Sequence, residues 1–209
     1  MSTSRPLLAP GQLAPDFTLP AADREGTVSL ADHRGREPVL LAFFRGIYCP
    51  FCRRQLTQLG QTAERLQAAG VGTLAVVATA ADRARLYFRF RPARIALGAD
   101  PELTTHAAYG VPRFAYSPQI REAIEEAAAA WAREVGVAAP PGRAHEVVAT
   151  LDEFQPLPSD KADEELHQAQ LLAQFLVDRD GVVRWASVEG RVGDFPSADT
   201  LEELVRTAL

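Results

Sequence analysis

The chain has 209 residues, of which 47% are hydrophobic and 23% are charged, and its formal net charge is -5. This length suits one domain that buries a core without disulfides or structural metals. The 27 acidic residues outnumber the 22 basic ones, so nothing indicates a surface for nucleic-acid phosphates. The strongest apolar run, residues 39–44, is much shorter than a membrane span, and residues 1–10 lack the apolar core of a signal peptide. We therefore expect a soluble, cytoplasmic protein with no nucleic-acid or membrane partner.

The first half of the chain predicts a strand–helix–strand unit behind a small hairpin. Brief alternation of apolar and polar residues at 17–19 and 28–30 favours two short strands at a sheet edge. Residues 38–44 form a continuous apolar run, which is typical of a strand covered on both faces. Apolar residues then recur at helical spacing until Gly70, and residues 72–78 form another buried run. The sheet is therefore at least partly parallel, with a right-handed crossover.

The later elements are shorter. In chain order, the pattern first predicts a helix over residues 82–90 capped by Asp82, a strand over 94–97, and a helix over 102–109 closed by Gly110. Two strands over 175–177 and 182–185 follow. A final helix runs from about 197 to 209, with a capping box at 200–203. The Asp-Gly pair at residues 180–181 indicates a tight hairpin turn between the last two strands.

Residues 112–170 separate two predicted sheet strands by more than a compact domain usually allows. A helix starts at Ser117 and ends near Gly136, and residues 152–165 then hold six carboxylates against one base, Lys161. We interpret the segment as an insertion, part helix and part mobile acidic loop. It is either a solvated cover over one sheet edge or a lid or partner surface.

The two cysteines, Cys49 and Cys52, stand between a predicted strand and the start of a predicted helix. At a helix amino terminus the free N–H groups and the positive end of the dipole lower the pKa of a thiol, and Arg45, Arg53 and Arg54 add positive charge nearby. The three-residue spacing also puts the two Cα atoms about 5–6 Å apart, within reach of a disulfide. We predict that Cys49 attacks and Cys52 resolves, in a redox centre that needs no external cofactor.

Other interpretations of the pair remain open at this point. Half of a zinc site is disfavoured, because no second cysteine pair exists and the four histidines, His33, His106, His145 and His167, lack ligand spacing, so we predict no metal. Two buried structural cysteines are the other alternative. Tyr48, Pro50 and Phe51 beside the thiols are expected to border a shallow apolar pocket.

Four blocks carry a family resemblance, namely residues 11–19 (GQLAPDFTL), 29–46 (SLADHRG…PVLLAFFRG), 100–113 (DPEL…AYGVPR) and 175–181 (FLVDRDG). With them the chain resembles the AhpC/TSA, or redoxin, group of thioredoxin-fold proteins, in particular peroxiredoxin-like members with a C-x-x-C site. The resemblance implies a three-layer α/β fold in which a central mixed β-sheet is flanked by helices. One thioredoxin-like domain then spans residues 7–209, with the helical and acidic insertion at 112–170 before the closing hairpin.

By this resemblance Cys49 stands in the place of the peroxidatic cysteine and Cys52 in that of a resolving one. Peroxide would oxidise Cys49 to a sulfenic acid, Cys52 would condense with it, and a thioredoxin or a low-molecular-weight thiol would reduce the disulfide. A homodimer is one expected assembly.

The sequence departs from the family where the usual Thr is Gly46, the usual Pro is Ala42, and the usual Arg aligns with Leu172. The position of the cis-Pro of thioredoxins also aligns with Leu172. We therefore consider Arg45, Arg53 and Arg113 as replacement cations that polarise a peroxide oxygen. A thiol-dependent peroxidase is the first functional hypothesis. The second is a thiol–disulfide oxidoreductase acting on protein or small disulfides, and the third is a non-catalytic adaptor that uses the acidic insertion.

Overall fold

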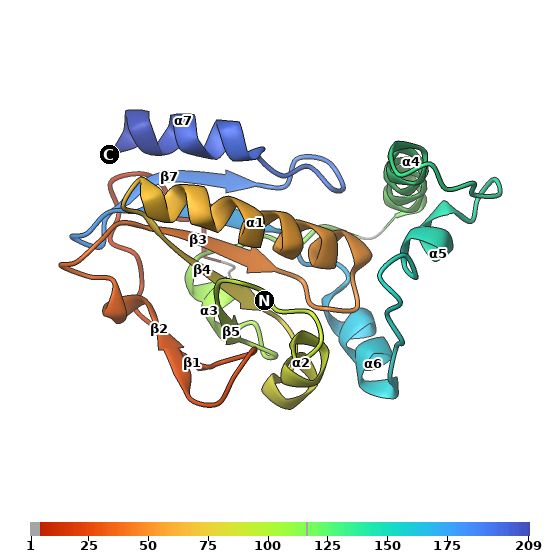
Figure 1. Cartoon of the computed structure of the whole chain (residues 1–209), viewed down its shortest axis with the longest axis horizontal. Coiled ribbons are helices and arrows are strands. Elements are labelled where there is room, and N and C mark those ends of the chain that lie inside the picture. Colours follow the sequence, from red (N-terminus) through yellow and green to blue (C-terminus); the bar gives the residue numbers. More distant parts are fainter. Residues whose placement is uncertain (1–4, 116) are drawn as a thin grey trace.

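The structure is a computed structural model that describes residues 5–115 and 117–209, and its centre is a five-stranded mixed sheet (Figure 1). Residues 1–4, part of the segment interpreted above as lacking a signal peptide, lie outside the described part. In spatial order the strands are β5 (Ala96–Ala99), β4 (Gly72–Val77), β3 (Val39–Phe44), β6 (Ala173–Val177) and β7 (Val183–Val188). The β3–β4 and β4–β5 pairs are parallel, whereas β3–β6 and β6–β7 are antiparallel. The predicted βαβ unit and closing hairpin are confirmed.

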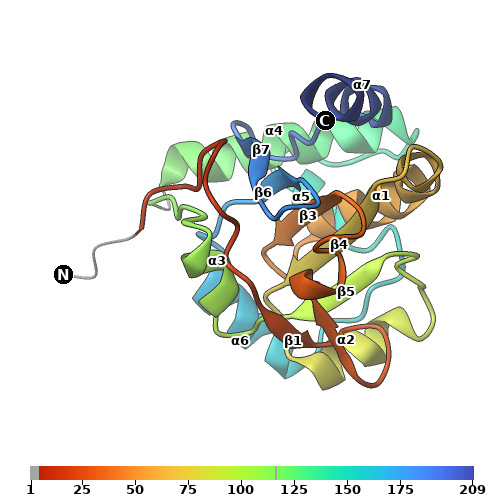
Figure 2. The ribbon, with the colours of Figure 1, turned by 90° about the vertical axis from the view of Figure 1, so that its left-hand side faces the viewer.

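The helices flank this sheet as the three-layer prediction requires (Figure 2). They are α1 (Pro50–Ala68), α2 (Ala81–Phe88), α3 (Thr104–Ala108), α4 (Pro118–Glu134), α5 (Ala144–Val148), α6 (Pro158–His167) and α7 (Ala198–Ala208), with a short 3-10 helix at Leu30–Asp32. Figure 2 shows α1 and α7 on one side of the sheet, and α3 with the amino-terminal segment on the other.

The central strand β3 explains why the layers form. All six of its residues are buried, and they divide by alternation between two cores. Leu40 and Phe44 pack with α1 and α7, whereas Leu41 and Phe43 pack with Tyr109 and the amino-terminal segment. A continuous apolar run therefore becomes a strand because helices or loops cover both of its faces.

Helix α1 fixes the position of the cysteines. Pro50 occupies its first turn, where a missing N–H costs nothing, and Gly70 ends it with a left-handed φ of 75°. Leu56, Leu59 and Leu66 bury one stripe against the sheet. The helix predicted after the cysteine pair is thus confirmed.

Several boundaries differ from those predicted because tertiary pairing overrides local signals. Helix α2 begins one residue earlier, and Ala80 rather than Asp82 is its N-cap. Strand β5 lies two residues later than predicted, since its register with β4 pairs Leu74 with Ala96. The predicted edge hairpin exists as a separate two-stranded sheet of β1 (Thr18–Pro20) and β2 (Thr27–Ser29), next to β5. In α7 the cap is Ser197, whose Oγ accepts from the Thr200 N–H at 3.2 Å, so the capping box at 200–203 is wrong.

The segment 112–170 contains α4, α5 and α6, which lie at the end of the sheet where β3 ends and α1 begins (Figure 1). Its acidic part is largely not a loop, because residues 158–167 form α6. Two of its carboxylates are held internally: Asp152 binds Arg53, and the buried Asp160 binds Arg83 at 2.7 Å. The acidic stretch is therefore more helical than expected, and its mobility stays a prediction. The division of the chain into one domain with an insertion stays a prediction.

None of the helices in the described ranges is both long enough and apolar enough to cross a membrane.

Candidate active site

Cys49 lies at the amino terminus of α1, as its N-cap residue. The turn from β3 to α1 is held by two hydrogen bonds, in which the Cys49 N–H donates to the Gly46 carbonyl at 3.3 Å and the Ile47 N–H donates to Thr79 Oγ1 at 3.1 Å. The Cys49 Sγ accepts a hydrogen bond from the Cys52 N–H at 3.3 Å. Only 5% of Cys49 is exposed and Cys52 is fully buried, and both are free thiols. The outer and inner placement predicted from the spacing is therefore what the structure shows.

The environment of Cys49 favours the thiolate. Burial raises the pKa of Cys49, but the Cys52 side chain, the positive charge of Arg45 and the Cys52 N–H together outweigh it. The resulting pKa is about 7, below the ordinary value of 9.0. Half of the sulfur is then ionised at neutral pH, which is the state that attacks electrophiles.

Cys52 has the opposite tendency. Burial raises the pKa of Cys52, and its hydrogen bond to Cys49 and the negative charge there raise it further. The inner sulfur therefore keeps its proton while the outer one is a thiolate. Of the two sulfurs, Cys49 is therefore the better nucleophile at neutral pH, because a thiol attacks only after it loses its proton.

Arg45 is the predicted cation that the structure brings to the sulfurs. It follows β3, is 6% exposed, and pairs with the buried carboxylate of Glu189. Glu189 follows β7, which runs in the same direction as β3 because two antiparallel pairings separate them. Sequence reasoning missed Glu189. Knowledge of the strand order would have pointed to it, because Glu189 follows a strand that runs in the same direction as β3.

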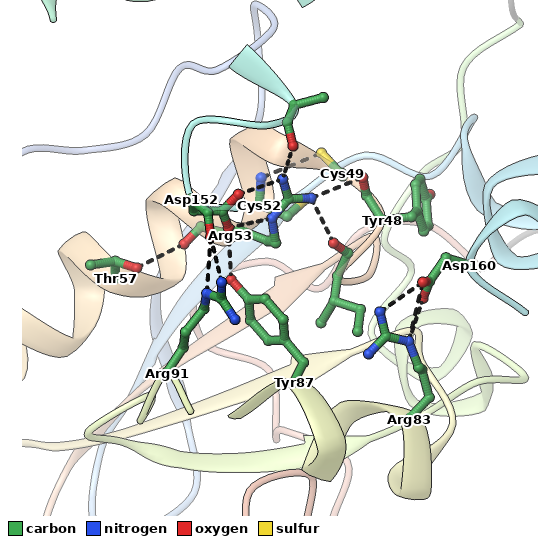
Figure 3. Close-up of polar contacts among 12 residues, drawn as sticks. Tyr48, Cys49, Cys52, Arg53, Thr57, Arg83, Tyr87, Arg91, Asp152 and Asp160 are labelled. Atoms are coloured by element: carbon green, nitrogen blue, oxygen red, sulfur yellow. Dashed lines mark hydrogen bonds and ion pairs between the residues drawn. The ribbon is translucent and has the colours of Figure 1, made fainter. Parts of the chain in front are cut away.

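Arg53 has a structural role that the sequence did not indicate (Figure 3). Its Nε and Nη2 bind the Asp152 carboxylate at 2.7 and 3.0 Å, Nη1 donates to the carbonyls of Ile47 and Tyr48, and Nη2 also donates to that of Ala149. All five N–H donors of a guanidinium are thus engaged. Arg53 fastens the loop before Cys49 to the insertion and does not line the cavity at Cys49, so the structure does not support it as the cation that polarises a peroxide oxygen.

The other two arginines also act elsewhere. Arg54 pairs with Glu134 at 2.7 Å and lies over the ring of Trp131, and Arg113 donates to the Leu166 carbonyl at 2.8 Å. Neither lines the cavity at Cys49. In the described part of the chain, Arg113 makes no contact with either cysteine, so the structure does not support it as the replacement cation.

A cavity of about 280 Å³ opens over Cys49. Tyr48, Pro50 and Phe51 line it, as predicted, together with residues that the insertion supplies, among them Ile124, Glu125, His145, Glu164 and Gln168. The ring of His145 stacks on Phe51 with centroids 6.3 Å apart, and burial lowers the pKa of His145. The insertion therefore covers the cysteines and adds polar groups to the site. Sequence reasoning missed these residues because they lie about 70 to 120 positions away from Cys49.

Within residues 5–115 and 117–209, no group of three or more His, Cys, Asp or Glu side chains is arranged to hold a metal ion. The histidines have other neighbours, since His33 contacts Glu37 and His106 contacts Asp100.

Residues 10–186 match the AhpC/TSA family. The chain belongs to this family. Its relatives include "Putative peroxiredoxin Rv2521" of Mycobacterium tuberculosis strain H37Rv and "Putative peroxiredoxin MT2597" of strain CDC 1551. Each is 37% identical over 109 residues, which are 49% of this chain and 66% of the relative. The chain thus spans just under two thirds of the length of these relatives.

Solved structures with similar folds come from two functional groups. The reduced 2-Cys peroxiredoxin of Plasmodium vivax matches with a TM-score of 0.61 and 16% identity, over 94% of this chain and 79% of that one. A protein described as "a putative Thiol:disulfide interchange protein DsbE" from Chlorobium tepidum matches with a TM-score of 0.54 and 23% identity, over 96% and 98% of the chains. At these identities the matches show the fold, which confirms the predicted fold class.

Gly46 stands at the position where the family resemblance implies a Thr. Gly46 has a φ of 147°, and a Cβ there would lie 2.9 Å from Thr79 Oγ1 and 3.0 Å from Tyr48 Cε1. The backbone and its neighbours therefore leave no room for a side chain. Leu172, at the position of the usual Arg, is buried in the same core as the cysteines.

Proposed function

We propose that the protein is a thiol-dependent peroxidase that reduces hydrogen peroxide or small organic hydroperoxides through a Cys49/Cys52 cycle. The observation that carries the proposal is the environment of the Cys49 sulfur. It has a pKa of about 7, and it lies at a helix amino terminus under a small cavity with a second thiol one helical turn further in. Membership in the AhpC/TSA family supports the same thiol-based redox chemistry.

The first step oxidises Cys49. Its thiolate attacks the nearer peroxide oxygen, a sulfur–oxygen bond forms as the oxygen–oxygen bond breaks, and the electron pair leaves on the far oxygen. The far oxygen takes the proton of the near one and departs as water or an alcohol. Cys49 is left as a sulfenate, which the Cys52 N–H and the charge of Arg45 stabilise.

The second step forms the disulfide. Cys52 passes its proton to the sulfenate and attacks the Cys49 sulfur, the sulfur–oxygen bond breaks, and hydroxide leaves to the solvent, where the buffer neutralises it. A thioredoxin or a low-molecular-weight thiol, the donors expected above, then supplies two thiols that return both cysteines to the reduced state.

The cavity favours a peroxide over a protein disulfide as the oxidising substrate. Cys49 is 5% exposed, and Phe51, Tyr48 and the insertion surround it. A two-oxygen group fits such a space, whereas a disulfide on a protein surface reaches the sulfur only if the cover moves. The apolar part of the wall also suits a small organic hydroperoxide.

A time course of thiol titration after a slight excess of hydrogen peroxide tests the proposal. We expect fast loss of two thiols in the wild type. In Cys52→Ser we expect loss of one thiol and a sulfenic acid that dimedone traps, and Cys49→Ser serves as the unreactive control. Slow thiol loss together with fast reduction of a model disulfide would establish the thiol–disulfide oxidoreductase instead. If Cys49→Ser behaved as the wild type in both assays, a non-catalytic adaptor would be the better description.

A further inference from the structure

Two buried hydrogen-bond donors beside Cys49 have no partner among the residues that the structure describes: the Nε of Arg45 and the hydroxyl of Tyr48. Both residues line the Cys49 cavity. A buried donor that stays unpaired lowers stability, so two such donors on residues that line one cavity point to a ligand that pairs with them. Both can donate, which suits a ligand whose oxygens accept hydrogen bonds.

The ring of Tyr48 occupies the space that a side chain at position 46 would need. A Cβ on Gly46 would be 3.0 Å from Tyr48 Cε1. The main chain at Tyr48 is also fixed, because its carbonyl accepts from Arg53 Nη1 at 3.1 Å (Figure 3). The ring of Tyr48 therefore fills part of the space beside Gly46, and this ring carries a hydroxyl.

The phenol remains protonated beside the thiolate. Burial raises the pKa of Tyr48, and the negative charge of the Cys49 thiolate raises it further. The charge of Arg45 acts in the opposite direction and is smaller in effect. Glu164 of α6, which also lines the cavity, adds to the rise. Tyr48 therefore keeps its proton, and can donate, in the range around neutral pH where Cys49 becomes a thiolate.

We propose that the Tyr48 hydroxyl is a catalytic group that donates a hydrogen bond to the peroxide while the Cys49 thiolate attacks it, together with the Nε–H of Arg45. The proposal rests on the peroxidase function proposed above. As the oxygen–oxygen bond breaks, the electron pair moves to the far oxygen, and the Tyr48 hydrogen bond stabilises the charge that develops there until that oxygen takes the proton of the near one. Tyr48 keeps its own proton, so atoms and charge balance as in the first step above.

Tyr48→Phe is the decisive variant because it keeps the ring and removes only the hydroxyl. Tyr109→Phe is the matched control: it removes another buried hydroxyl, which donates to the Pro15 carbonyl at 2.8 Å and lies on the opposite face of the sheet. For each reduced protein, two second-order rate constants are measured, one with hydrogen peroxide and one with iodoacetamide. Iodoacetamide needs the thiolate but offers no peroxide oxygen, so it reports any structural damage to Cys49.

We expect Tyr48→Phe to react with peroxide about 100-fold more slowly than the wild type, while its alkylation rate and that of Tyr109→Phe change by less than about twofold. A peroxide rate within about threefold of the wild type would overturn the role of Tyr48 and leave the peroxidase function standing. An equal loss in both reactions would also overturn it, since the hydroxyl would then only support the structure. A wild type that reacts with peroxide no faster than free cysteine would refute the peroxidase function and this proposal with it.

Discussion

Removal of the hydrogen-bond donor on the Cys52 side chain should raise the pKa of Cys49. Among the influences that lower this pKa, the Cys52 side chain is the largest, ahead of Arg45 and the Cys52 N–H. Two substitutions separate the donor from the thiol chemistry. Cys52→Ser keeps a hydroxyl that can donate to the Cys49 sulfur, whereas Cys52→Ala has no donor.

The size of the effect follows from the structure. A pKa of about 7 in place of 9.0 corresponds to about 3 kcal/mol in favour of the thiolate, at about 1.4 kcal/mol per pH unit. A hydrogen bond to a charged group contributes about 1.5–3 kcal/mol, so its loss should move the midpoint upward by about one to two pH units. At pH 7 the thiolate fraction of Cys49 would fall from about one half to between about 10% and about 1%.

Alkylation by iodoacetamide as a function of pH measures this midpoint, and each variant retains Cys49 as its single cysteine. Because the thiolate is the reacting form, the rate rises with pH and levels off above the pKa. Cys52→Ser should show a midpoint close to that of the native site, and Cys52→Ala a clearly higher one. Equal midpoints in the two variants would refute the role given to the Cys52 side chain. A midpoint near 9 in both would refute the depressed pKa itself.

Three further predictions concern the surroundings of the site. Asp152→Asn should lower the free energy of unfolding, measured in urea, by about 2–4 kcal/mol, because the buried Arg53 loses its counter-charge. The control Asp199→Asn, at an exposed ion pair, should lower it by at most about 0.5 kcal/mol. Equal losses in the two variants would refute the structural role of the Arg53–Asp152 pair. Gly46→Ala should lower the free energy of unfolding by about 2–4 kcal/mol, through backbone strain and overlap of the new Cβ with its neighbours. Gly70→Ala should lower it by only about 1 kcal/mol, because no neighbouring atom lies within 4 Å of its added Cβ, and thermal unfolding of both variants tests this order. Arg113→Ala should keep the wild-type peroxide rate in stopped-flow measurements, and a tenfold loss or more would contradict its placement away from the thiols.

Local patterns in the sequence were enough to predict most of the fold. Residues 38–44 and 72–78 are continuous apolar runs with an amphipathic stretch between them, and a helix long enough to cross over forces the two strands to be parallel. The ends of elements were less predictable. The N-cap of α7 is Ser197 rather than Thr200, because the Ser197 Oγ accepts a hydrogen bond from the Thr200 N–H and Thr200 lies inside the first turn.

The sequence by itself determined that a nucleophilic sulfur sits at a helix start with a second sulfur one turn away, since Cys49, Pro50 and Cys52 are neighbours in the chain and helix geometry does the rest. Only the tertiary structure decided which charges act on these sulfurs. Arg45 at the end of β3 meets Glu189 at the end of β7 across the one strand, β6, that lies between them, and Arg53 binds Asp152 of the insertion. Hydrogen bonds and ion pairs depend on distance in space, and the folding of the sheet and insertion sets that distance for residues about 100 to 144 positions apart.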